Sequence, residues 1–288
     1  MRRMKTSTIL AAILGFLAPI QLCAQTKQVA PSARIETSQE FAARVTPLEK
    51  IEFDAATKAF DEHRYADSLA SFQSLLKELP AEPLLIKFAS EAALQTGDTA
   101  FALNQLIPIV KANPDDWQAL CLLTRAYAES GDKINRDSGI AQMLVLHRRG
   151  VTPSGLQRYI VERIKEGDNA LVIWTSLEPW GYYKVYALGQ VSDSSGLIFL
   201  RITLESNDFD QPSFAREHPK EASEGLRQFS LDAYRETGLN NSGQRTQTHY
   251  TFQFFVGQPS YDTVREEFIK IATGKATPIS SRSNLVVS

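Results

Sequence analysis

Residues 65–80 read YADSLASFQSLLKELP, and residues 97–114 read GDTAFALNQLIPIVKANP. Both stretches place apolar residues at helical spacing, and both end on a proline, Pro80 and Pro114, which stand 34 positions apart. A period of this length is typical of stacked helical hairpins, which bury their apolar faces only against one another. The two stretches therefore predict a helical stack in this part of the chain.

The same pattern extends to both sides of these stretches. The spacing predicts paired helices over 50–79 and over 83–112, and a third first helix from about Asp115 to Tyr127. Gly97 and Gly131 fall in the turns between paired helices, again 34 positions apart. The third repeat loses its register after Asp132, so it is expected to be degenerate.

These positions resemble the tetratricopeptide repeat (TPR). Gly97 and Gly131 match its small turn position, and Ser68 and Ala102 match its small residue at the helix crossing. Its bulky packing positions are matched by Tyr65, Phe72, Leu106 and Tyr127. One departure is His63, which replaces the turn glycine of the first repeat. The resemblance covers residues 50–149 and implies a stack of two clear repeats plus the degenerate third.

After residue 150 the helical period gives way to alternating and apolar runs. The runs predict a short helix over 153–166, and then strands over 170–176, 182–191, 196–206, 228–234 and 247–256. A last helix is expected over 261–273, capped by Ser260 or Asp262 and stopped by Gly274. Strands that follow one another without helices favour an antiparallel sheet. The expected fold is thus a TPR-like helical stack followed by an α+β domain over 150–276, with a flexible tail over 277–288.

The amino terminus has the layout of a secretory signal peptide over residues 1–24. Arg2, Arg3 and Lys5 precede an apolar run over 9–17, and Ala24 follows as a cleavage position. An uncleaved anchor is disfavoured because the run is shorter than the roughly 20 residues that span a bilayer. Residues 25–49 are polar and read as a flexible linker. We expect an exported protein, periplasmic or secreted, with no transmembrane segment after cleavage.

The TPR resemblance implies that the first helix of each pair lines a concave groove that holds peptides. Register then places seven residues on this inner face: Thr57, Asp61, Lys87, Glu91, Gln95, Arg125 and Glu129. Lys87 and Arg125 are suited to hold a ligand carboxylate. Glu91 and Glu129 can neutralise their neighbours, and the alternative is an ordinary helix surface with internal ion pairs.

Signals of catalysis and of other ligands are few. The four histidines, at 63, 147, 218 and 249, lack metal-ligand spacing, and no Gly-x-Ser-x-Gly or phosphate loop occurs. The net charge of −2 gives no basic excess for nucleic acid. We therefore expect no cofactor, no metal and no catalytic residue, and a scaffold that binds a protein or peptide. Two alternatives stay open: a cell-envelope hydrolase with its site in the carboxy-terminal domain, and repeats that only support that domain, with the groove filled by the chain itself.

Overall fold

The computed structural model describes residues 35–166, 169–177, 183–193, 196–205, 215–239, 245–257 and 260–285. The expected signal peptide over 1–24 lies outside these residues, as does the expected linker up to residue 34.

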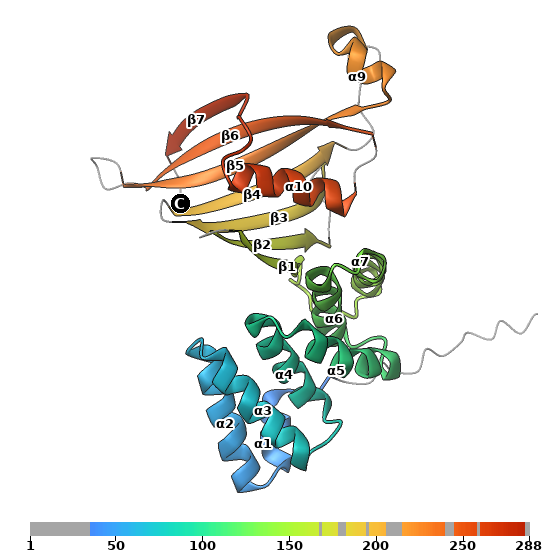
Figure 1. Cartoon of the computed structure of the whole chain (residues 1–288), viewed down its shortest axis with the longest axis vertical. Coiled ribbons are helices and arrows are strands. Elements are labelled where there is room, and N and C mark those ends of the chain that lie inside the picture. Colours follow the sequence, from blue (N-terminus) through green and yellow to red (C-terminus); the bar gives the residue numbers. More distant parts are fainter. Residues whose placement is uncertain are drawn as a thin grey trace, which may run out of the picture. The chain divides into compact units, whose positions relative to one another are not determined.

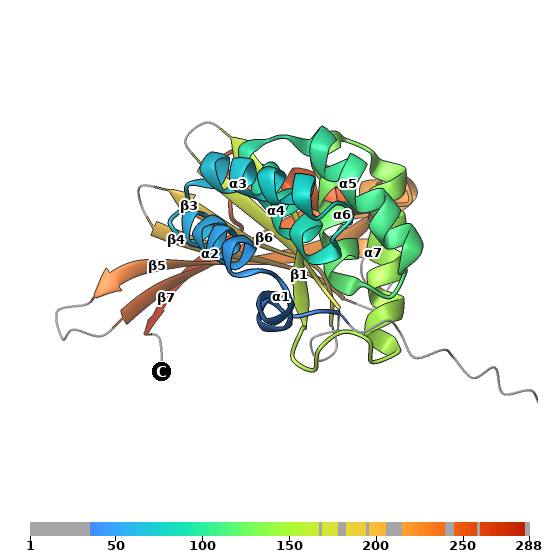
Figure 2. The same ribbon diagram turned by 90° about the horizontal axis from the view of Figure 1, so that it is seen from below.

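Helices form the first half of the described chain (Figure 1). They are α1 (Ser38–Arg44), α2 (Pro47–Asp61), α3 (Tyr65–Glu78), α4 (Pro83–Thr96), α5 (Thr99–Ala112), α6 (Trp117–Ser130) and α7 (Lys133–Arg148). From α2 onward each helix packs on the next, which makes three successive hairpins that can be followed in Figure 2. The predicted TPR-like stack is confirmed.

Short turn sequences set the spacing of the hairpins. Gly97 and Gly131 end α4 and α6 in the left-handed conformation, with φ of 84° and 81°, which glycine adopts without steric cost. The aspartates that follow them, Asp98 and Asp132, accept a backbone hydrogen bond in the first turn of α5 and of α7. A two-residue Gly-Asp turn thus closes one helix and opens its partner.

The third hairpin is complete, although its sequence departs from the repeat, in line with the prediction of a degenerate third repeat. Helix α7 runs for 16 residues against α6. At the crossing position of Ser68 and Ala102 the third hairpin carries a buried Arg136. The close approach comes instead from Gly139, where an added Cβ would lie 3.0 Å from the Cβ of Thr124. The small residue has moved by three positions, which hid the repeat in the sequence.

The structure also differs from the flexible linker expected over 25–49. Helix α1 lies within this range, and Thr37 and Glu40 form a capping box at its start. Its Phe41 is fully buried, with its ring 4.9 Å from the ring of Phe53. A seven-residue helix with one anchoring phenylalanine carries too little periodicity to be read from sequence, because its stability comes from tertiary burial.

The described residues of the second half contain one seven-stranded antiparallel sheet whose strands follow chain order. The strands are β1 (Arg158–Glu166), β2 (Asn169–Ser176), β3 (Tyr183–Asp193), β4 (Gly196–Glu205), β5 (Arg227–Leu239), β6 (Arg245–Val256) and β7 (Ser280–Leu285). A short helix α9 (Pro219–Ser223) precedes β5, and α10 (Tyr261–Ala272) packs on strands β2, β3 and β4 (Figure 1). The antiparallel sheet and the final helix, capped by Ser260, are confirmed.

Two predictions at the ends of this region are wrong. The segment expected as a helix over 153–166 forms strand β1, whose register shifts between Ile160 and Glu162. Such a shift breaks the alternation that identifies a strand. Within the expected tail over 277–288, residues Ser280–Leu285 form strand β7, which pairs with β6 at His249 and Arg282. Its polar sequence suits an edge strand and gave no strand signal.

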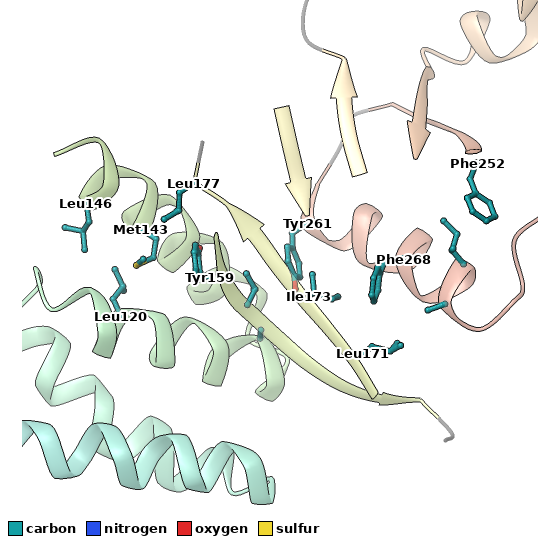
Figure 3. Close-up of a cluster of buried hydrophobic side chains, with 14 residues drawn as sticks. Leu120, Met143, Leu146, Tyr159, Leu171, Ile173, Leu177, Phe252, Tyr261 and Phe268 are labelled. Atoms are coloured by element: carbon teal, nitrogen blue, oxygen red, sulfur yellow. The ribbon is translucent and has the colours of Figure 1, made fainter. Parts of the chain in front are cut away.

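One hydrophobic core joins the third hairpin to the sheet and α10 (Figure 3). Its buried side chains include Leu120 and Met143 from the hairpin, Tyr159 and Ile173 from β1 and β2, and Phe268 from α10. Within the described residues, no helix has both the length and the apolar character needed to cross a bilayer.

Candidate functional site

The predicted groove residues lie on the inner helices α2, α4 and α6 in two rows at 34-residue steps. One row is Thr57, Glu91 and Arg125, and the other is Asp61, Gln95 and Glu129. The seventh residue, Lys87, precedes Glu91 by one turn. Side-chain contacts bring five of these seven residues into two networks, one around Lys87 and one around Arg125, whereas Thr57 and Asp61 belong to neither.

Lys87 is buried rather than presented to a ligand. Its Nζ lies 3.2 Å from Asp116 Oδ2 and donates to Gln118 Oε1 at 2.9 Å. Asp116 itself caps α6 by accepting from the backbone N–H of Ala119. The ammonium therefore joins α4 to the start of α6, and its predicted role toward a ligand carboxylate remains a prediction.

Arg125 holds the centre of the second network and is only 2% exposed. Its Nε donates to Glu129 Oε1 at 2.6 Å, and its Nη1 donates to Glu91 Oε1 at 2.8 Å. Gln95 donates to the same Glu91 oxygen at 2.8 Å. Burial raises the pKa of Glu129, which Arg125 partly offsets. Two carboxylates thus already neutralise the guanidinium, and its role toward a ligand also remains a prediction.

Strand β1 closes the third-repeat end of these rows. The backbone N–H of Arg163 donates to Glu129 Oε1 at 3.2 Å. The Arg163 guanidinium lies near enough to Arg125 and Glu91 for their charges to act on its pKa, which partial burial and the charge of Arg125 together lower. Sequence reasoning missed Arg163 because it read this segment as a helix.

The row that contains Lys87 is covered along all three hairpins. Its members at 34-residue steps are Phe53, Lys87 and Cys121. Phe41 of α1 covers Phe53, and Cys121 Sγ lies 3.6 Å from Met143 Sδ, where burial raises the pKa of the thiol. The exposed part of the inner face is therefore narrower than predicted: Asp61 is exposed, and Thr57, Glu91 and Gln95 are partly exposed.

A second polar cluster joins the third hairpin to β1 and α10. Arg136 Nη1 donates to Asp262 Oδ1 at 3.0 Å, and its guanidinium lies 4.3 Å from the centre of the Tyr261 ring. The Tyr261 hydroxyl donates to Glu162 at 3.2 Å, and Arg265 binds both oxygens of Glu162. Burial tends to raise the pKa of Asp262, but hydrogen bonds from Arg136 and Lys133 outweigh it and lower the pKa.

This second cluster is a structural joint rather than a binding site. Glu162 is buried and its oxygens are already bound on both sides. The residues stand up to 126 positions apart in sequence, so no sequence motif predicted the cluster. Among the described residues, no group of three or more His, Cys, Asp or Glu is placed to hold a metal ion.

Comparison with known proteins gives little to add. No family model and no curated protein matches the chain. Among solved structures, the TPR domain of Sgt2 from Aspergillus fumigatus matches with 16% identity and a TM-score of 0.34, over 36% of this chain and 70% of that one. A TM-score this low does not support a functional assignment for this chain. The three hairpins, their 34-residue step and the Gly-Asp turns of the second and third hairpins make the amino-terminal helices a TPR-like repeat.

Proposed function

We propose that the protein is an exported, non-catalytic binding protein that holds a protein or peptide at the exposed part of the groove. The observation that carries this is the pattern of exposure. Asp61, Thr57, Glu91 and Gln95 stay accessible on the inner helices, whereas Lys87 is buried behind them. Polar groups on rigid helices suit recognition of a partner's side chains.

The charges of this face favour a partner that carries lysine or arginine. Asp61 is exposed, and none of the described cations forms an ion pair with it. Glu91 keeps a quarter of its side chain exposed although Arg125 binds it. A cation that docks on either carboxylate would gain charge-assisted hydrogen bonds.

Selection of peptides on the purified protein tests this proposal. We expect a phage-displayed library of random peptides to yield binders with basic residues, and Asp61→Lys to weaken them about tenfold, because it replaces attraction with repulsion. Affinity is measured by fluorescence anisotropy with labelled peptides. The control is Glu78→Lys, which makes the same change at an exposed position of α3, away from the inner helices.

Selected peptides that bind Asp61→Lys and the unchanged protein equally would contradict the groove assignment. A selection that yields no binder would favour a second candidate, in which the repeats support the sheet. The observation behind that candidate is the contact of β1 with the third hairpin, where Arg163 donates its backbone N–H to Glu129.

Export rests on the residues at the amino terminus. Arg2, Arg3 and Lys5 before the apolar run support secretion, with cleavage after Ala24. We expect intact mass spectrometry of the protein made from the full chain to show a mature form that begins at Gln25. A full-length protein that stays inside the cell would contradict export and would leave the groove proposal untouched.

A further inference from the structure

The face of α2 that carries Ile51 and Ala55, its outer face, is exposed, whereas the equivalent faces of α4 and α6 are buried. Counting in 34-residue steps, Ile51 corresponds to Leu85 in α4 and to Ala119 in α6. Leu85 and Ala119 are 0% exposed, whereas Ile51 is 65% exposed. The residues one turn on repeat this contrast: Ala55 is exposed, whereas Ala89 and Leu123 are buried.

In the second and third hairpins this face is covered by the preceding helix. Leu69 and Leu76 of α3 pack against the cluster that contains Leu85 and Ala89. Their equivalents in α5, Leu103 and Val110, pack against the cluster that contains Ala119, Leu123 and Ala126. The covering element is each time a helix with two aliphatic residues seven positions apart.

The far end of the stack has its own cover. Leu144 of α7 stands where Leu76 and Val110 stand in the earlier hairpins. It packs against the core that includes Tyr159 of β1 and Phe268 of α10. The sheet domain therefore covers the last hairpin, while the first hairpin has no equivalent cover among the described residues. A repeat array with an open apolar end exposes a surface suited to stacking.

We propose that the outer face of α2 is a docking surface for a basic amphipathic helix of another protein. This surface consists of Leu48, Ile51 and Ala55, with the stem of Lys58 beside them. Leu48 is 66% exposed, so the two large aliphatic residues lie open one turn apart. The incoming helix takes the place that α3 takes on α4, and it presents two aliphatic residues seven positions apart.

The net negative charge of α1 and the first hairpin selects the partner. Residues 35–82 contain ten Asp and Glu but only five Lys and Arg. Glu52 borders the docking surface and has no ion pair with the described cations, and Glu62, which pairs with Arg64 and Lys58, lies at its far end. Lysine or arginine on the flanks of the helix would complement these carboxylates. The same excess disfavours a second copy of this chain, because two acidic faces would meet.

The side chain of Lys58 reduces the apolar area of the docking surface but does not cover it. It occupies the position of Ala92 and Ala126 and lies 3.9 Å from Glu62. A lysine stem can lie along an apolar helix while its ammonium remains in water. The contact is therefore centred on Leu48 and Ile51.

The probe for this surface is a labelled helical peptide with the sequence of residues 65–79, stapled to hold the helix. In the basic form, Asp67 and Glu78 are changed to lysine, and the unchanged acidic form is the comparison. We expect the basic form to bind the purified full chain more tightly, as measured by fluorescence anisotropy. Ile51→Lys should weaken it about tenfold to a hundredfold, since the isoleucine would be buried in the complex.

Two controls separate this surface from other causes. Ile107→Lys makes the same substitution at an exposed isoleucine of α5 and should leave binding unchanged. A peptide with alanine in place of Leu69 and Leu76 should lose binding. Circular dichroism checks that each variant keeps its helices, and Ile51→Ser serves as a milder second variant.

Equal binding of the basic and acidic peptides, or binding indifferent to both changes at Ile51, would overturn the proposal. A dimer that is detected by sedimentation and that dissociates on Ile51→Lys would also overturn the proposal, because a second copy of this chain would then occupy the surface. The groove proposal is tested separately, because Ile51→Ser adds no charge and leaves all seven groove residues unchanged, whereas Asp61→Lys leaves Leu48 and Ile51 unchanged.

Discussion

Replacing Phe72 with alanine is expected to lower the free energy of unfolding by about 3–5 kcal/mol. Phe72 is fully buried, and its ring stacks on Phe88 at 5.4 Å and meets Phe53 edge-on at 6.1 Å. The variant would lose the transfer free energy of the ring and would leave a cavity among aromatic neighbours that cannot fill it. Urea unfolding followed by circular dichroism measures the change.

Phe60→Ala is the matched control for this substitution. Phe60 is only partly buried and makes one edge-on ring contact, with Tyr65 at 5.1 Å. Phe60→Ala should therefore lower the free energy of unfolding clearly less than Phe72→Ala does. If both variants lost the same stability, the aromatic cluster would not be the core of the first two hairpins.

Replacing Glu162 with alanine is expected to lower the free energy of unfolding by about 3 kcal/mol. Removing one partner of a buried ion pair leaves the other charge unpaired, which typically costs about 3–5 kcal/mol. We expect the lower end of this range for Glu162→Ala, because Arg265 keeps 31% of its side chain exposed and can regain contact with water. The Tyr261 hydroxyl, which is buried, would also lose its acceptor.

The control for Glu162 is Glu267→Ala, also in an ion pair that involves α10. Glu267 is 18% exposed and pairs with Lys270, whose side chain is 49% exposed. Because the lysine can regain water when its partner is removed, we expect a loss of about 1 kcal/mol or less. We also expect the helix signal and the tryptophan fluorescence, to which Trp174 of β2 contributes, to change in one transition, because the third hairpin and the sheet share a core. If Glu162→Ala lowered the free energy of unfolding no more than Glu267→Ala does, the assignment of the Glu162 cluster as a structural joint would be contradicted.

Local sequence rules were sufficient for the hairpins of the stack. The Gly97-Asp98 and Gly131-Asp132 pairs act within a few residues: glycine permits the left-handed turn, and aspartate caps the next helix. The predicted site rows also followed, because helical register and the 34-residue step place Thr57, Glu91 and Arg125 on equivalent faces. What register could not predict was exposure.

Burial at the site depends on elements that are distant in sequence. Lys87 meets Asp116, and Glu129 receives the backbone N–H of Arg163, 34 positions later. Helix α1 and strand β1 cover parts of the inner face, and neither was predicted. Both are short or irregular, so their own sequences carry a weaker signal than the core that they complete.

The sequence by itself determined the helical repeat, the antiparallel sheet and the last helix, because each rests on spacing and turn residues within one element. Only the tertiary structure decided which repeat faces are closed. Helix α1 covers part of the inner face, the sheet covers the last hairpin, and the outer face of α2 is left open at Ile51. The physical reason is that equivalent repeat positions have the same local geometry, whereas burial depends on what packs against them.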